Sequence, residues 1–142
     1  MRKSCRHSNV QNMFLRNCIL SVFILAASWA GTSLAATEQK FPDVVSVTVR
    51  SGHEDSFDFD VTVSSPYDSG QRYADGFRIT GDDGKVYGER KLWHDHATEQ
   101  PFTRDLYGVK IPRGIRTVKV QARDQKYGYG GKIVEASLPG RQ

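Results

Sequence analysis

Two histidines in the second half of the chain, His94 and His96, form the residue pair whose type and spacing best suit chemistry. On an extended backbone, residues two positions apart point to the same side, so both imidazoles can reach one ion. Glu99 follows three residues later and can add a carboxylate oxygen. Imidazole ligands suit copper or zinc. The pattern predicts a metal site of His94, His96 and Glu99, and the alternative is a solvated or structurally hydrogen-bonded histidine pair.

The segment that follows these histidines has two interpretations. Its sequence is Glu99-Gln100-Pro101-Phe102-Thr103-Arg104. The guanidinium of Arg104 is a planar fork that can hold a carboxylate or a phosphate, which predicts ligand capture. In the alternative, the segment is a shaped loop in which Pro101 fixes the backbone and Glu99 pairs with Arg104.

A second candidate binding segment lies near the end of the chain, with the sequence Tyr127-Gly128-Tyr129-Gly130-Gly131. Tyrosines offer broad amphipathic contact area, and glycines let a ligand approach the backbone closely. The alternative is a glycine-rich loop whose tyrosines cover the end of the core. Trp93 can extend a binding surface for a sugar or a peptide, but we expect it to be a core residue or a lid over the core.

The histidine-containing segment and the glycine-rich segment together form a pattern that is similar to one in other proteins. The pattern His94-x-His96-x-x-Glu99-Gln100-Pro101-Phe102-Thr103-Arg104, followed by Gly128-Tyr129-Gly130-Gly131, resembles a set of small exported bacterial proteins of uncharacterised function. The likeness covers residues from about 60 to 138. It implies a bacterial exported domain, and it implies no activity, cofactor or site.

Catalytic constellations are weak in this sequence. Both cysteines, Cys5 and Cys18, lie in the first 36 residues, so the remainder has no thiol nucleophile. No serine stands in an elbow motif. We therefore expect a protein that is not an enzyme, with a small hydrolase or lyase using His96 and Glu99 as the weaker alternative.

Residues 1–36 have the pattern of a signal peptide. A basic stretch precedes an apolar run from Cys18 to Trp29, and small residues close the segment. Cleavage is expected before Ala36 or before Thr37, and Met13 is an alternative start. The sequence thus predicts a periplasmic or secreted protein, one domain over 37–142, and membrane contact only during export.

Removing residues 1–36 changes the charge balance. The chain has 20 basic and 16 acidic residues, and the first 36 residues contain four basic residues and no acid. The remainder therefore has 16 of each, with a formal net charge of zero. This balance gives no support for nucleic-acid binding, which needs clustered lysine and arginine.

Period-two alternation of apolar and polar residues recurs after residue 43, and helical periodicity is absent. The alternation is clearest from Phe57 to Ser64. Seven strands are expected, at 44–50, 56–64, 75–80, 86–93, 105–111, 116–123 and 132–138. They predict an all-β, seven-stranded antiparallel immunoglobulin-like β-sandwich, similar to fibronectin-type-III domains in strand count. The Cys…Trp…Cys core of true immunoglobulin domains is missing.

Strand direction indicates which loops lie together. If successive strands alternate in direction, the loops after the second, fourth and sixth strands share one end of the sandwich. Long loops with aromatic and ionisable residues are where such domains usually place function. We therefore expect this end to bind a protein, peptide or glycan. The expected ligand-binding residues are Tyr67, Arg72, Arg104, Tyr127 and Tyr129.

Overall fold

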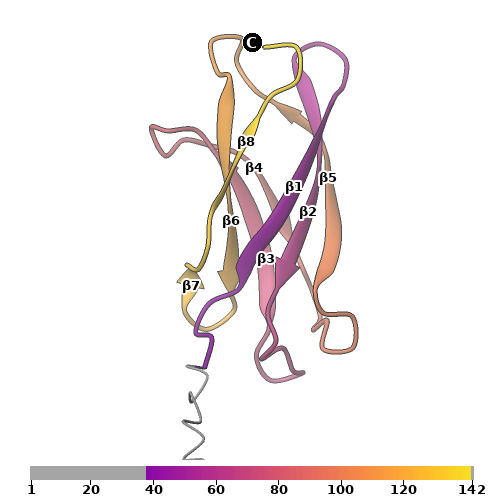
Figure 1. Ribbon diagram of the computed structural model, residues 1–142, viewed down its shortest axis with the longest axis vertical. Coiled ribbons are helices and arrows are strands. Elements are labelled where there is room, and N and C mark those ends of the chain that lie inside the picture. The colour runs from indigo at the N-terminus through magenta and orange to yellow at the C-terminus, as the bar shows by residue number, and fades with distance from the viewer. Residues whose placement is uncertain (1–37, 142) are drawn as a thin grey trace, which may run out of the picture. The chain divides into compact units, whose positions relative to one another are not determined.

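The computed structural model describes residues 38–141, in which every regular element is a β-strand (Figure 1). The signal peptide predicted for residues 1–36, and both cysteines with it, lie outside the described residues. Two antiparallel sheets face each other around one apolar core. The strands are β1 (Asp43–Ser51), β2 (Ser56–Ser64), β3 (Ala74–Thr80), β4 (Val86–Lys91), β5 (Phe102–Lys110), β6 (Thr117–Asp124), β7 (Gly128–Tyr129) and β8 (Val134–Ser137).

The first sheet contains three strands in the order β1-β2-β5. Its central strand, β2, buries every second residue, as its alternating sequence predicts. The buried side chains are Phe57, Phe59, Val61 and Val63. Because both neighbours of β2 run antiparallel to it, this strand fixes the register of the whole sheet.

The second sheet contains five strands. Its order is β4-β3-β6, and β7 and β8 pair with successive halves of β6 along the same edge. β6 buries Val118, Val120 and Ala122, the residues that the alternation predicts. Within residues 38–141, no helix has the length and apolar character that a bilayer crossing requires.

The strands differ from the prediction in their number, in their bounds and in their register. Eight strands are present where seven were expected, because the short strand β7 forms at residues 128–129, which the prediction assigned to the loop before the last strand. Residues 102–104 belong to β5, where Phe102 and Arg104 pair with Val63 and Val61 of β2. In β1, the register shifts between Val44 and Ser46, and Val45 is consequently 47% exposed.

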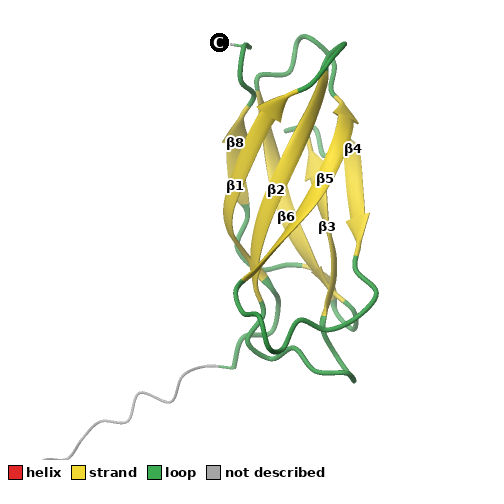
Figure 2. Ribbon diagram, turned by 90° about the vertical axis from the view of Figure 1, so that its right-hand side faces the viewer, coloured by secondary structure: helices red, strands yellow, loops and turns green. Residues whose placement is uncertain are grey.

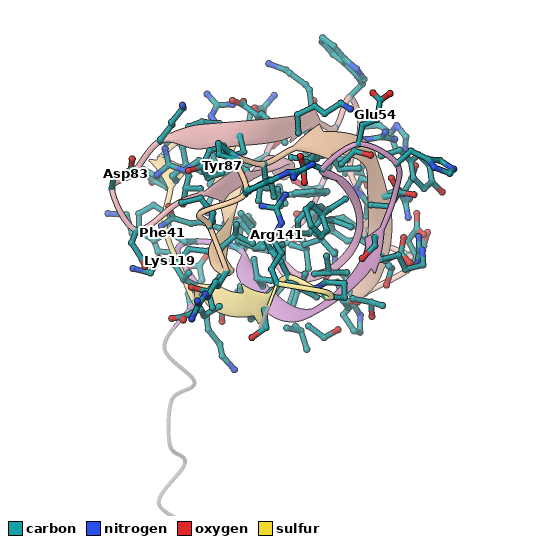
Figure 3. The ribbon with its side chains drawn as sticks, turned by 90° about the horizontal axis from the view of Figure 1, so that it is seen from above. Phe41, Glu54, Asp83, Tyr87, Lys119 and Arg141 are labelled. Atoms are coloured by element: carbon teal, nitrogen blue, oxygen red, sulfur yellow. The ribbon has the colours of Figure 1, made fainter. Side chains whose placement is uncertain are left out.

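One end of the sandwich is closed by short turns and by Arg141. Seen from above, Arg141 lies across this end, with its guanidinium above the core (Figure 3). The guanidinium donates hydrogen bonds to the carbonyls of Ile111 (2.7 Å), Pro112 and Ile115 (3.3 Å) and to the carboxylate of Asp55 (3.1 Å). The C-terminal segment is thereby fastened to the β5–β6 turn.

The opposite end carries the long loops, in agreement with the strand-direction argument (Figures 1 and 2). Three connections meet there, namely β2–β3, β4–β5 and the segment between β6 and β8. The described chain also enters the first sheet at this end, through residues 38–42. We call this assembly the loop end, comprising residues 38–42, 65–73, 92–101 and 125–133.

Candidate functional site at the loop end

A buried carboxylate joins two of the loops. Asp68 is 7% exposed and accepts hydrogen bonds from the backbone N–H groups of Ala74 (2.9 Å) and His96 (3.1 Å). Both of its oxygens are therefore used by backbone donors. Asp68 thus holds the loop between β4 and β5 against the loop between β2 and β3.

His96 is part of the core of this end. It is 2% exposed, and its ring stacks on Phe102 with 4.0 Å between the ring centroids. Neither ring nitrogen has a hydrogen-bond partner within residues 38–141, and Nδ1 lies 3.9 Å from the Asp68 carboxylate. Burial, together with the charge of Arg104, lowers the pKa of His96. The imidazole is therefore neutral at pH 7 and buried, and its unprotonated nitrogen has no hydrogen-bond partner among the described residues.

The other two predicted metal ligands lie differently. His94 is exposed, and its ring centroid is 4.8 Å from that of His96. The Glu99 carboxylate is bound by the Arg104 guanidinium at 2.7 and 3.3 Å, and this bond lowers the pKa of Glu99. No group of three or more His, Cys, Asp or Glu residues placed to hold a metal ion occurs in the part of the chain described. The structure thus brings the two imidazoles together and engages Glu99 elsewhere.

The segment from residue 99 to residue 104 contains the ion pair that its alternative interpretation expects. Gln100, which precedes a cis peptide bond to Pro101, bridges two loops. Its side chain accepts a hydrogen bond from the Ser65 N–H (2.7 Å) and donates to the Ser65 hydroxyl and the His96 carbonyl, both at 3.2 Å. The guanidinium of Arg104 is paired with Glu99, as the alternative interpretation of this segment expects.

Three of the predicted ligand-binding residues gather in one place. The Arg72 guanidinium lies 4.1 Å from the ring centroid of Tyr67 and 4.8 Å from that of Tyr127. Burial raises the pKa of Tyr67, and the neighbouring carboxylate of Asp124 adds to this rise. The Tyr67 hydroxyl is buried without a hydrogen bond to the described chain. Tyr127 is 44% exposed, so it forms the outer part of this stack.

Asp124, at the end of β6, positions the stack. One of its oxygens accepts the N–H groups of Lys126 (2.9 Å) and Tyr127 (2.7 Å), and the other accepts Nε of Arg72 (3.0 Å). Burial opposes ionisation of this carboxyl group. The Tyr127 N–H, the nearby Tyr67 hydroxyl, the Lys126 N–H and the charge of Arg72 together outweigh burial and lower the pKa of Asp124. The carboxylate is therefore charged, completely buried and fully used inside the protein.

Sequence reasoning missed three residues of this surface. Lys40 and Lys126 place their ammonium groups 4.9 and 5.2 Å from the ring centroid of Tyr127, and Phe41 packs edge-on against the same ring at 6.2 Å. Neither lysine forms an ion pair with another of residues 38–141. We call Lys40, Arg72, Lys126 and Tyr127 the cation–tyrosine cluster. The contacts of Lys40 and Phe41 with Tyr127 join residues far apart in the sequence, so they have no local signal.

The glycines before β8 serve the protein's own chain. A Cβ on Gly130 would lie 2.6 Å from Cε1 of Phe41, and a Cβ on Gly131 would lie 2.8 Å from the Asp43 carboxylate. Gly131 also has a positive φ of 74°. The same carboxylate accepts the Lys132 N–H at 2.7 Å. These glycines therefore form a slot for residues 41–43, in the place where the sequence analysis expected a ligand.

Two aromatic residues lie apart from the cluster. Tyr129 belongs to β7 and covers Arg78 of the five-stranded sheet, with 3.8 Å between the guanidinium and the ring centroid. Burial, followed by the nearby charge of Glu89, raises the pKa of Tyr129 to about 12. Trp93 is 78% exposed beside Lys91, so the expectation that it is a core residue or a lid is wrong.

In comparisons with known proteins, no protein-family model, no curated protein and no solved structure matches this chain. The arrangement of its own residues is thus the basis for assigning a function.

Proposed function

We propose that this chain is an exported binding domain of the immunoglobulin-like sandwich type, without enzymatic activity, that captures an anionic protein, peptide or glycan with its loop end. The cation–tyrosine cluster is the observation that carries the proposal. Three cationic groups lie within 4.8 to 5.2 Å of one half-exposed tyrosine ring. The signal-peptide pattern of residues 1–36 supports export.

The charge balance of the cluster favours an anionic ligand. Arg72 is neutralised by Asp124, whose oxygens already accept three hydrogen bonds. The charges of Lys40 and Lys126 remain without a partner in the described chain. Like charges gathered on one surface raise the local potential and attract an anion. Tyr127 adds a rigid, amphipathic contact of the kind that recognition surfaces use.

Binding to defined polymers tests this proposal. The purified chain should bind immobilised alginate or polyglutamate in biolayer interferometry, and it should not bind neutral dextran. The Lys40→Ala/Lys126→Ala double variant should lose this binding. A matched control, Lys85→Ala/Lys110→Ala, removes the same charge outside the loop end and should bind normally. Equal loss in both double variants would show that net charge, and not the cluster, causes binding, and would contradict the proposal.

A second candidate function is metal binding by His94 and His96, with copper or zinc as the ion. Its specific support is the buried ring of His96, because buried polar atoms without partners are uncommon and need an explanation. Titration calorimetry with Zn(II) and Cu(II) should show one site that is lost in His94→Ala and retained in His53→Ala. Glu99→Gln separates a three-ligand site, which it weakens, from a two-imidazole site. Heat that survives His94→Ala would exclude this function.

A further inference from the structure

The end opposite the loop end contains a second concentration of positive charge. A hollow of about 380 Å³ opens there, lined by Asp55, Arg113, Arg116, Gly140 and Arg141. We call it the arginine hollow. It combines three guanidinium groups with one carboxylate, and it is separate from the cation–tyrosine cluster.

Asp55 neutralises only part of the positive charge of the arginine hollow. Its carboxylate is bound by Nε of Arg113 at 2.9 Å and by the guanidinium of Arg141 at 3.1 Å. The arginines lower the pKa of Asp55, that of Arg113 first, so it contributes one full negative charge. The other acid of the same turn, Glu54, pairs with Lys110 at 3.5 Å. Among the described residues that line the hollow, three positive charges and one negative charge leave a surplus of two.

The three arginines differ in what they can still bind. The side chain of Arg141 is 9% exposed, and its terminal nitrogens donate hydrogen bonds to backbone carbonyls and to Asp55. Arg141 is therefore a positive charge held in a fixed position. Arg113 bonds Asp55 through Nε, and no bond to another described residue uses its two terminal nitrogens. Arg116 forms no ion pair within residues 38–141. Arg113 and Arg116 therefore have donors for a ligand beside a fixed positive charge.

Acids on the neighbouring surface are already engaged. Asp82 and Asp83 line the adjacent hollow that Arg116 also borders. Asp82 pairs with Lys119 at 2.9 Å, and Asp83 accepts the Lys85 N–H at 3.0 Å. Neither acid forms an ion pair with Arg116, so its guanidinium has no carboxylate partner among the described residues.

We propose that the arginine hollow binds a phosphate group through Arg113 and Arg116. A guanidinium matches phosphate oxygens with two parallel hydrogen bonds, and two such forks beside a fixed charge suit a dianion. The lining contains no aromatic or aliphatic side chain, which favours a small charged ligand over an apolar one. The source is free phosphate or a phosphorylated molecule.

Titration calorimetry with inorganic phosphate, at constant ionic strength and pH 7, tests this site. The wild-type chain should bind one phosphate. Arg116→Gln and Arg113→Gln should each weaken binding about tenfold, the loss of roughly one charge-assisted hydrogen-bond pair. Arg50→Gln removes the same charge from β1 and should bind as the wild type does. Absence of heat at about 10 mM phosphate, or equal affinity in all four proteins, would overturn the proposal.

Vesicles identify the source of the phosphate. Sedimentation with phosphatidic acid vesicles, whose headgroup is a phosphomonoester, but not with phosphatidylcholine vesicles, would assign the hollow to a lipid headgroup if it is lost in Arg116→Gln. Phosphate binding without sedimentation would assign it to a soluble ligand. Vesicle binding that survives both arginine variants, together with no phosphate heat, would overturn the proposal. The Lys40→Ala/Lys126→Ala variant should bind phosphate normally, so the two proposed sites can fail independently.

Discussion

Replacing Arg141 with alanine should destabilise the protein strongly, although this residue is the second from the C-terminus of the chain. The side chain donates hydrogen bonds to three backbone carbonyls and to Asp55, and its guanidinium lies 4.7 Å from the ring centroid of Phe57. Hydrogen bonds from a charged donor contribute about 1.5–3 kcal/mol each, but they are not additive.

The expected loss in the free energy of unfolding depends on which of the hydrogen bonds of Arg141 water can replace. Ile111 is 1% exposed, so its carbonyl would remain buried without a partner, which costs about 1–3 kcal/mol. Pro112 is exposed, so water can bond its carbonyl. The two considerations together give a loss of about 2–4 kcal/mol in the free energy of unfolding. Arg141→Lys keeps the charge but has a single nitrogen, and it should recover less than half of this loss.

Urea denaturation followed by far-UV circular dichroism measures the effect. Arg113→Ala is the matched control, because Arg113 also binds Asp55 but is 88% exposed and bonds no buried carbonyl. Its unfolding midpoint should stay near that of the wild type. A loss below about 1 kcal/mol in Arg141→Ala, or equal losses in the two variants, would refute the reasoning that the buried carbonyls set the magnitude.

Three further predictions concern the loop end. Gly130→Ala should lower the free energy of unfolding by about 1–3 kcal/mol in urea denaturation, because the new Cβ overlaps the Phe41 ring, whereas Gly114→Ala, with open space around it, should not. Gln100→Ala should lower it by about 1–3 kcal/mol, since the buried Ser65 N–H loses its partner; a change no larger than that of Gln71→Ala would contradict this. The pKa of Asp124 is lower in the folded protein than in the unfolded chain, so the ionised carboxylate stabilises the fold above about pH 4. This stabilisation is lost as the pH falls through the pKa of the folded state. Asp124→Asn should therefore make the free energy of unfolding less dependent on pH in acid.

The strand pattern was predictable because burial on one face of a sheet repeats every two residues. β2 and β6 show this alternation without interruption, and their buried faces are those expected, whereas β3, which lies between β4 and β6, is buried along almost its whole length. The shift at Val44 in β1 and the inclusion of residues 102–104 in β5 were not predictable. Both depend on which strand lies opposite, and local alternation carries no information about that partner.

The candidate site was predictable only in part. Alternating strand direction correctly predicted which loops share one end of the sandwich, and Tyr67, Arg72 and Tyr127 are in contact at that end. The role of Gly130 and Gly131 could not be read from the sequence, because the group that fills their slot is Phe41, near the other end of the chain. The same holds for Lys40, which reaches Tyr127 only once residues 38–42 are in place.

The contact between residues 41–43 and residues 130–132 also bears on the order of folding. Asp43 and Lys132 are 89 positions apart, so the first strand of the domain cannot complete its contacts until residue 132 has been made. Pairings this distant are slow to form, because the loop must be closed before the contacts stabilise it. The cation–tyrosine cluster draws on three such distant segments. It is therefore absent from a nascent or truncated chain, and binding through it would report that the domain has finished folding.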